Sequence, residues 1–518
     1  MQRMSGIDPM FIYSETAASP MEVAYACVFD PATAHAGYSF EAVRDHLTRR
    51  LPGLAPFRRR LMSVPMGLDH PRWVDDPDFD LDNHLHRDGL PSPGEEAGLQ
   101  DLAADIMGRK LDPDIPPWEM HIVEGLRDGK IGVISKVHHA VIDGVSGSAI
   151  LAQLLDPTPE ADPARDQEDV WQPAPAPSRV RLVTEALPDL LSNPVRMVRA
   201  GQEVGRTALR VARHVASRGT SALSIPLGAP AQFAAPLGAG RRVSFAHLNL
   251  EDVLTLRDYA DVTVNDVVLA VCSGALRTYL AEHGRETASP LVAVVPVSVR
   301  EHSERHAMGN RLSAMFVPLA SDQERPLDRL RTIALTSKST KAQERAVGYS
   351  TLAAAVAQAF PPVLARPALR LGAQIGAVRR LRPGNLVISN VPGPKFPLFF
   401  AGMRMLSVYP LGPVIDGVAL NITVQSYVDS LFVGLNACPK VVPDTDSLAR
   451  LVEEELTILT KAAQNDSQLS HAREAGSVLT GPPPEVRPLS LRVPESTTEQ
   501  DAFLCGPRAL AFGVPCLQ

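Results

Sequence analysis

A β-hairpin that ends in two adjacent histidines places the strongest constraint on how this chain folds. Residues 120–126 and 131–137 are two apolar runs of strand length. The Asp128-Gly129 pair between them is typical of a two-residue hairpin turn. The two runs are therefore predicted to be antiparallel neighbours in a sheet.

The same turn predicts a register. If Arg127 pairs with Lys130 across the turn, Trp118 lies opposite His139. The segment that contains Trp118 would then pack beside the histidines.

The two histidines are predicted to have different roles. Side chains alternate across a strand, so His138 and His139 should point to opposite faces. His139, four residues before Asp143, is the predicted reactive base, because an imidazole can accept the proton of an alcohol or amine near neutral pH. His138 is predicted to be buried with local hydrogen bonds, and Gly144 to allow a tight turn. Residues 146–155 have helical spacing, so strand, turn and helix would form one rigid mount.

Several other chemistries find no support in the sequence. No metal is expected at the histidine pair, because adjacent side chains on a strand diverge and no third ligand follows with zinc-like spacing. A Gly-x-Ser-x-Gly nucleophile elbow and a phosphate-binding Gly-x-x-x-x-Gly-Lys run are both missing from the sequence. The five cysteines are scattered, which predicts reduced and mostly buried thiols. They are Cys27, Cys272, Cys438, Cys505 and Cys516.

Length and composition restrict the class of protein. The 518 residues, 45% of them hydrophobic, are enough to bury more than one core. A net charge of −7 argues against a nucleic-acid binder. The sequence shows neither an apolar signal core at its start nor a run of ~18 apolar residues, so a soluble or peripheral protein is expected.

The organisation along the chain can also be predicted. Residues 1–156 should form a mixed α/β half that carries the histidines. Residues 157–240 should be a Pro-rich linker followed by a basic helical connection. Residues 241–464 repeat the α/β character, and residues 465–518 are predicted to be a disordered tail.

The connection and the second half carry further patterns. Residues 179–218 contain eight arginines and three acidic residues with valines and leucines between them. A basic amphipathic helix of this kind can lie on anionic lipid or can cover the core as a solvated helix, and both interpretations stay open. Strand-like runs of the second half lie at residues 291–299, 312–319, 385–389, 418–426 and 431–436.

The histidine stretch resembles the His-His-x-x-x-Asp-Gly motif of the coenzyme-A-dependent acyltransferase superfamily. Within it, the chain is most similar to the bacterial wax ester synthase/diacylglycerol acyltransferase family, from about residue 4 to about residue 462. Pro117 departs from the family's usual Pro-Leu-Trp and removes a backbone donor, whereas Trp118 is kept. Trp118 is expected either to fill the core or to contact substrate. The segments that carry the resemblance, in order, are Gly6-Ile7-Asp8, Ser19-Pro20-Met21, Pro116-Pro117-Trp118, Asn265-Asp266-Val267-Val268, Gly309-Asn310-Arg311-Leu312-Ser313 and Ser389-Asn390-Val391-Pro392-Gly393-Pro394.

This resemblance implies a fold and a reaction. The fold is α/β (α+β), with two chloramphenicol-acetyltransferase-like domains that form a pseudo-dimer around a central substrate tunnel. His139 would take the proton from the hydroxyl of a diacylglycerol or fatty alcohol, which attacks the thioester of a long-chain acyl-coenzyme A. The product would be triacylglycerol or wax ester, with no covalent acyl-enzyme. Acyl-coenzyme A is a substrate, so no cofactor is implied.

The resemblance also implies roles for other residues. Asp143 would be structural and paired with an arginine, and either Arg58 or Arg60 is the candidate partner. Asn265 and Asp266 would either cap a helix or support the site. A cytoplasmic protein is expected, peripheral to the inner face of the membrane or to lipid droplets.

Two other functions fit the same scaffold. The first is condensation-domain-like or carrier-dependent acyl transfer to another acceptor, although carrier modules are missing from this sequence. The second is a non-catalytic lipid-binding protein. The presence of both His139 and Asp143 argues against that second function.

Overall fold

The computed structural model describes most of the chain in two units, residues Met1–Asp466 and Ser467–Gln518. The described residues are 1–4, 8–141, 153–160, 172–191, 231–285, 289–298, 312–347, 362–376 and 384–479, with isolated positions between 194 and 213 and at Arg380 and Arg382.

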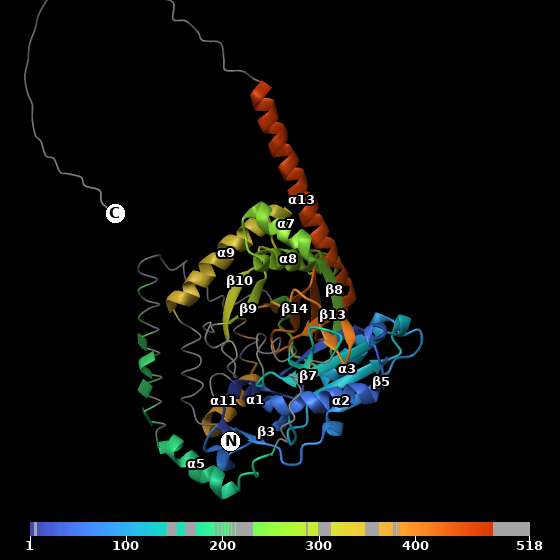
Figure 1. The fold of residues 1–518 in the computed structure, drawn as a ribbon. Coiled ribbons are helices and arrows are strands. Elements are labelled where there is room, and N and C mark those ends of the chain that lie inside the picture. The colour runs from blue at the N-terminus through green and yellow to red at the C-terminus, as the bar shows by residue number, and fades with distance from the viewer. Residues whose placement is uncertain are drawn as a thin grey trace, which may run out of the picture. The chain divides into compact units, whose positions relative to one another are not determined.

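The first large sheet contains the predicted hairpin. Its six strands lie in the order β12-β13-β2-β7-β6-β5, and only the β5–β6 pair is parallel. Figure 1 labels β5, β7 and β13 of this sheet. Their bounds are β2 (Glu22–Asp30), β5 (Leu85–Gly89), β6 (Trp118–Glu124), β7 (Ile131–His138), β12 (Phe399–Phe400) and β13 (Met403–Leu411).

The hairpin between β6 and β7 confirms the predicted turn but not the predicted register. Asp128 and Gly129 both have positive φ, at 59° and 67°, as a two-residue hairpin turn of this type requires. Trp118, however, lies opposite Val137 and not opposite His139, so the predicted register is wrong by two residues.

The cause of this shift lies at Gly125. The ladder with β7 ends at Val123, opposite Gly132, and the carbonyl of the next residue, Glu124, accepts a hydrogen bond from the Leu90 amide at 2.9 Å. Gly125 takes a φ of 89°, and the Arg127 amide donates to the Gly94 carbonyl at 2.8 Å. Because the shift is even, every side chain keeps its predicted face of the sheet.

Helices cover both faces of the first sheet. On one face, α2 (Phe40–Arg50) packs through His46, whose ring meets Phe400 edge-on at 5.3 Å. On the other face, the C-terminal end of α3 (Glu96–Gly108) lies over Lys136 of β7, whose ammonium donates to the Ile106 carbonyl at 2.8 Å. A short helix α1 (Asp8–Ser14) and a small sheet in the order β1-β4-β3 lie on the same half. That small sheet consists of β1 (Gln2–Arg3), β4 (Arg72–Asp75) and β3 (Arg59–Met62).

The second large sheet confirms the strand-like runs predicted for the second half. Its six strands lie in the order β10-β9-β11-β14-β15-β8, and β11 is parallel to both of its neighbours. Helices α7, α8 and α9 lie over it in Figure 1. The bounds are β8 (Arg242–Asn249), β9 (Val292–Ser298), β10 (Leu312–Pro318), β11 (Leu386–Val391), β14 (Leu420–Tyr427), β15 (Ser430–Ala437), α7 (Leu250–Ala260), α8 (Val264–Glu282), α9 (Pro326–Val347), α11 (Pro362–Gln374) and α13 (Thr445–Leu479).

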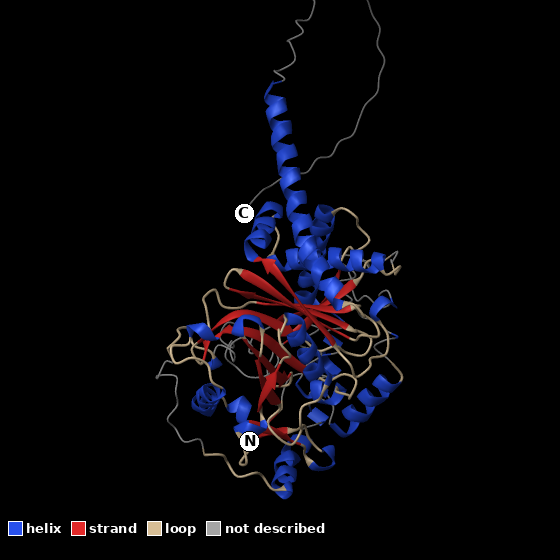
Figure 2. Cartoon of the chain, turned by 90° about the vertical axis from the view of Figure 1, so that its right-hand side faces the viewer, coloured by secondary structure: helices blue, strands red, loops and turns tan. Residues whose placement is uncertain are grey.

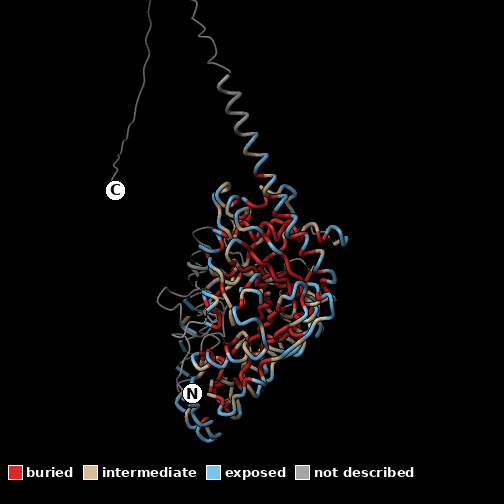
Figure 3. Tube along the Cα trace, turned by 45° about the vertical axis from the view of Figure 1, so that its right-hand side comes forward, coloured by how far each residue is buried: buried red, intermediate tan, exposed pale blue. Residues whose placement is uncertain are grey.

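Two hydrophobic cores follow from the two sheets. Figure 3 shows the buried residues gathered in the interior of the first unit. In Figure 2 the strands of the sheets, in red, lie in the interior with helices, in blue, around them. One strand pair departs from the order of the chain, because β12 and β13, from residues 399–411, belong to the first sheet. Tyr409 of β13 stacks on Phe245 of β8 with ring centroids 4.0 Å apart, which joins the two sheets.

The predicted bounds of the linker, the second half and the tail stay predictions. The predicted division at residues 156 and 241 stays a prediction. The strands β12 and β13, which come after residue 241, belong to the first sheet. The helix α13 continues through residues 465–479 of the predicted tail, and residues 480–518 lie outside the described residues. Helix α5 (Arg179–Leu191) forms part of the predicted basic helix, and Cys27, Cys272 and Cys438 are free and buried.

No single described helix is long and apolar enough to cross a bilayer. The helices Leu250–Ala260 and Val264–Glu282, bent by 106° at the break between them, have the length and composition of a span only when taken together. Most of α8 is buried in the second core.

Candidate active site

The paired histidines lie at the end of β7, between two neighbouring strands. The His138 amide donates to the Pro117 carbonyl at 3.0 Å, on the β6 side. The His139 amide donates to the Met21 carbonyl at 2.8 Å, on the β2 side. Since successive amides reach opposite neighbours, the strand alternation continues through His139, and the two side chains leave from opposite faces.

His138 is enclosed by the protein. Its side chain is 4% exposed, and its Nδ1 accepts a hydrogen bond from the Ala140 amide at 3.0 Å. Burial, together with the smaller effects of the nearby His139, Lys110 and Lys136, lowers the pKa of His138 to about 3. The ring is therefore neutral near pH 7, with its proton on Nε2.

His139 has a more open environment. Its side chain is half-buried, and its ring stacks on Phe11 of α1 with centroids 4.3 Å apart and planes 10° apart. The stack fixes the plane of the imidazole in a residue that is only partly buried. A ring held in this way can exchange a proton with a hydroxyl group placed next to it.

The remaining members of the histidine motif cannot be placed. Asp143 and Gly144 lie outside the described residues, so the predicted ion pair with Arg58 or Arg60 stays a prediction. Arg58 is buried, and burial lowers its pKa. Arg60 has its Nε 3.5 Å from Asp76 Oδ1 and donates to the Asp114 carbonyl at 3.1 Å.

Trp118 is part of the first core. Its side chain is buried, and its Nε1 donates to the Phe57 carbonyl at 2.8 Å. Its ring stacks on His84 with centroids 4.5 Å apart and meets the Phe57 ring edge-on. Trp118 therefore fills the core beneath the site, which is the first of the two roles expected from the sequence.

Asp266 and its neighbours form a helix cap. Thr263 is the N-cap of α8, and its Oγ1 accepts from the Asp266 amide at 3.2 Å. The Asp266 carboxylate accepts in return from the Thr263 amide at 3.0 Å, which completes a capping box. Asn265, in the first turn, is half-buried.

Two buried charged residues beside His138 were not predicted. Glu22 of β2 lies opposite His138, and its Oε1 accepts from the Leu111 amide at 3.1 Å. Burial raises the pKa of Glu22 to about 7, against the opposing effect of the Lys136 ammonium. Lys136 is fully buried and donates to the Ile106 and Arg109 carbonyls at the end of α3. A lysine inside an otherwise apolar strand run was the signal available in the sequence.

Gly393 shows why the family-like segment at residues 389–394 contains a glycine. A Cβ at this position would lie 1.9 Å from the Ser426 carbonyl oxygen, so only glycine fits. Its amide donates to Ser426 Oγ at 3.0 Å, which joins the loop after β11 to β14. In the earlier segment, Gly309, Asn310 and Arg311 lie outside the described residues.

Comparisons with known proteins agree with this architecture. The family model for the wax ester synthase/diacylglycerol acyltransferase catalytic domain matches residues 4–268, and the model for the WS/DGAT C-terminal domain matches residues 308–460. One relative from Mycobacterium tuberculosis, named a diacylglycerol O-acyltransferase, is 35% identical over 496 residues, which are 92% of this chain and 93% of that protein. A second from the same species, with a name of the same kind, is 35% identical over 463 residues, 89% of this chain and 99% of that protein.

Solved structures give the fold. The wax ester synthase/diacylglycerol acyltransferase from Marinobacter aquaeolei VT8 superposes with a TM-score of 0.65 at 25% identity, over 90% of this chain and 100% of that one. The first condensation domain of the calcium-dependent antibiotic synthetase superposes with a TM-score of 0.54 at 16% identity, over 89% and 96% of the two chains. The fold is thus the predicted two-domain, chloramphenicol-acetyltransferase-like α/β fold, and its substrate tunnel stays a prediction. The chain belongs to the wax ester synthase/diacylglycerol acyltransferase family and is an acyltransferase.

Proposed function

We propose that this acyltransferase esterifies diacylglycerol with the acyl chain of a long-chain acyl-coenzyme A, and that it also accepts long-chain alcohols. His139 is the general base. It takes the hydroxyl proton as the alcohol oxygen attacks the thioester carbonyl carbon. The tetrahedral oxyanion then collapses, the carbon–sulfur bond breaks, and the coenzyme A thiolate takes the proton from the imidazolium.

The difference between the two histidines is the observation that carries this proposal. His138 is buried and hydrogen-bonded to the adjacent backbone, whereas His139 is half-buried and its ring stacks on Phe11. No acyl-enzyme is needed, because the base acts on the acceptor directly. Much of the rate then comes from holding the two substrates at one imidazole.

The relatives support the choice of substrates. The mycobacterial relatives are named diacylglycerol O-acyltransferases, and the protein from Marinobacter is named both a wax ester synthase and a diacylglycerol acyltransferase. Diacylglycerol and long alcohols partition into lipid, so we expect a cytoplasmic protein that is peripheral to a membrane or a lipid droplet. Helix α5 offers exposed apolar side chains, among them Val180 and Leu191, beside its arginines.

The other site residues have supporting roles in this proposal. Asp143, paired with Arg58 or Arg60, holds the histidine loop, and Gly144 allows its turn. Trp118 supports the end of β7 from the core. Neither a metal nor a cofactor takes part in these steps.

A thiol-release assay tests the proposal. The purified protein is given a long-chain acyl-coenzyme A with diacylglycerol, with hexadecanol or with no acceptor, and free thiol and ester product are both measured. His139→Ala should lower acceptor-dependent turnover by about 10²- to 10⁴-fold, the usual contribution of a general base. The circular dichroism spectrum should stay unchanged, because the ring is only half-buried.

His35→Ala is the matched control, since His35 is an exposed histidine beside Glu160. It should leave turnover at the wild-type level. Full ester synthesis by the His139→Ala protein would exclude this histidine as the base. Thiol release that depends on an amine or a carrier-bound acceptor, and not on an alcohol, would favour the condensation-type alternative.

A further inference from the structure

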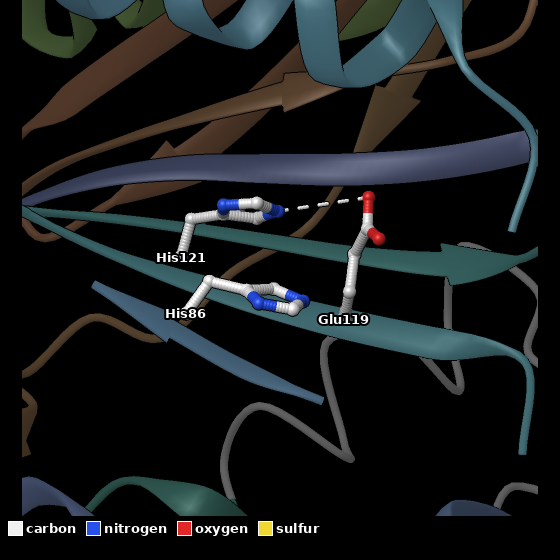
Figure 4. A group of neighbouring side chains, drawn as sticks. All are labelled: His86, Glu119 and His121. Atoms are coloured by element: carbon white, nitrogen blue, oxygen red, sulfur yellow. Dashed lines mark ion pairs between the residues drawn. The ribbon is translucent and has the colours of Figure 1, made fainter. Parts of the chain in front are cut away.

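A second cluster of chemically reactive side chains lies on the first sheet, away from the paired histidines. One ligand atom each from His86, Glu119 and His121 lies within 4.8 Å of the other two. Figure 4 shows both rings with a nitrogen turned toward the Glu119 carboxylate. His121 is buried, whereas His86 and Glu119 are half-buried, so the cluster is open on one side.

The strands explain how these residues meet. His86 of β5 and His121 of β6 are direct partners in the parallel ladder. Glu119 stands two residues before His121 on β6, so its side chain leaves from the same face. Because 33 residues separate Glu119 from His86 in the sequence, short-range spacing gives no indication of the cluster.

A neighbouring carboxylate orients the buried ring. His121 Nδ1 lies 2.8 Å from Asp88 Oδ2, so Nδ1 carries the proton and donates it to Asp88. That leaves Nε2 with a lone pair, 3.6 Å from Glu119 Oε1. This Nε2 is buried and has no hydrogen-bond partner within the described part of the chain. Metal-binding histidines usually have this arrangement, with a carboxylate holding the nitrogen that does not bind the metal.

The charges nearby leave room for a cation. Asp88 and Glu119 bring two negative charges, and the Lys136 ammonium, 3.3 Å from Glu119 Oε1, brings one positive charge. Lys136 is also held by two carbonyl groups at the end of α3, so its position depends only partly on Glu119. An acceptor nitrogen and an acceptor oxygen that face each other repel unless a proton or a metal cation lies between them.

We propose that His86, Glu119 and His121 bind a zinc ion that ties the edge strand β5 to β6. Two imidazoles and one carboxylate are a common zinc ligand set, with water as the fourth ligand. Zinc–ligand bonds of about 2.0–2.2 Å place donor atoms roughly 3.4 Å apart, so small rotations of the three side chains suffice to close the site. The ion would join a five-residue edge strand to the interior of the sheet.

Zinc binding to the full-length protein without an affinity tag tests this proposal. The protein is treated with a chelator, dialysed and titrated with zinc, and bound metal and thermal stability are both measured. One zinc per chain and a rise in melting temperature on zinc addition are expected, because a ligand that binds only the folded state stabilises it. His86→Ala, Glu119→Gln and His121→Ala should each abolish both effects.

Two further variants separate the metal from general damage to the sheet. Asp88→Asn keeps all three ligands and should weaken zinc binding about 10- to 100-fold, as loss of an outer-shell partner does. His35→Ala removes an exposed histidine beside a carboxylate and should change neither the zinc affinity nor the zinc-induced shift. Circular dichroism reports whether each variant is folded.

The competing interpretation is that a second proton on His121 bridges Asp88 and Glu119. In that case nitrogen NMR of the histidine rings would show His121 doubly protonated at neutral pH, with no change on zinc addition. That result, or a wild-type zinc affinity in folded His86→Ala protein, would overturn the proposal.

Discussion

At the scale of single residues, burial separates two side chains that are identical in chemistry and adjacent in sequence. The strand alternation sends His138 inward and His139 toward α1. The alternation could be predicted from the sequence, and so could the choice of the more accessible ring. The Phe11 stack could not, because 128 residues separate the two rings and nothing local joins them.

The low pKa of His138 makes a prediction about pH and stability. Its pKa is 6.5 in the unfolded chain and about 3 in the folded protein. Between those values the unfolded chain binds a proton that the folded protein does not, so the free energy of unfolding falls as the pH falls. The slope is about 1.4 kcal/mol per pH unit, which gives roughly 2 kcal/mol between pH 6.5 and 5.

His138→Asn removes this contribution while its amide oxygen can still accept from Ala140. Urea unfolding of both proteins from pH 7.5 to pH 5 should show the wild type losing more stability than the variant. Glu22, with its raised pKa, has the opposite sign, because it favours the folded protein as the pH falls from about 7 toward 4.5. Because Glu22 is present in both proteins, its contribution cancels when the stability of the variant is subtracted from that of the wild type. A wild-type minus variant difference that stays constant with pH would contradict the assignment.

At the scale of elements, the helix α8 shows how a motif residue can have a structural role. The sequence left Asn265 and Asp266 open between capping and chemistry. The reciprocal bonds between Thr263 and Asp266 assign the capping role to Asp266. For the hairpin between β6 and β7, the predicted turn is correct and the predicted register is wrong. The register differs because the chain at Gly125 turns toward Leu90 and Gly94.

Asp266→Ala should therefore act on stability. Loss of the capping box is expected to lower the free energy of unfolding by about 0.5–2 kcal/mol, since the Thr263 amide and hydroxyl both lose the carboxylate that accepts from them. Asp266→Gln should recover part of this loss, because Gln also serves at the third position of a capping box. Urea unfolding measures both changes.

The matched control for this prediction is Asp252→Ala. Asp252 holds the same position in α7, but the N-cap Asn249 accepts from its amide without a reciprocal side-chain bond in the described structure. That substitution should cost only a few tenths of a kcal/mol, through the helix dipole. Equal losses in the two aspartate variants would contradict the capping role of Asp266.

At the scale of the molecule, the two sheets are joined where β13 of the first meets β14 and β15 of the second. Gly434 of β15 lies so close to β13 that a Cβ would be 2.0 Å from the Pro410 carbonyl oxygen and 3.0 Å from a Leu411 methyl group. The aromatic contact between Tyr409 and Phe245 lies in the same region. The two sheets can thus approach this closely only because residue 434 is a glycine, which has no Cβ.

Gly434→Ala should force the sheets apart. The expected loss is at least about 1–3 kcal/mol in the free energy of unfolding, the usual cost of overpacking, because the clash is with backbone that cannot rotate away. Gly89→Ala is the control, since Gly89 is also a strand glycine but a Cβ there would contact nothing within 4 Å. Its effect should stay within about 0.5 kcal/mol. A tolerated Gly434→Ala, measured by urea unfolding, would show that the sheets are less tightly packed than described.

The sequence by itself determined the features that depend on neighbours along the chain. Alternating and continuous apolar runs marked the strands, the Asp128-Gly129 pair marked the turn, and the ordered segments marked the family. These features are local because the alternation within a strand, the turn type and the helix caps are set by residues close in sequence.

Only the tertiary structure decided which distant segments meet. It placed β12 and β13 in the first sheet, Phe11 on His139, and His86 beside Glu119 and His121. Strand order and cross-sheet contacts depend on how two cores bury their surfaces together, and no local pattern records that packing.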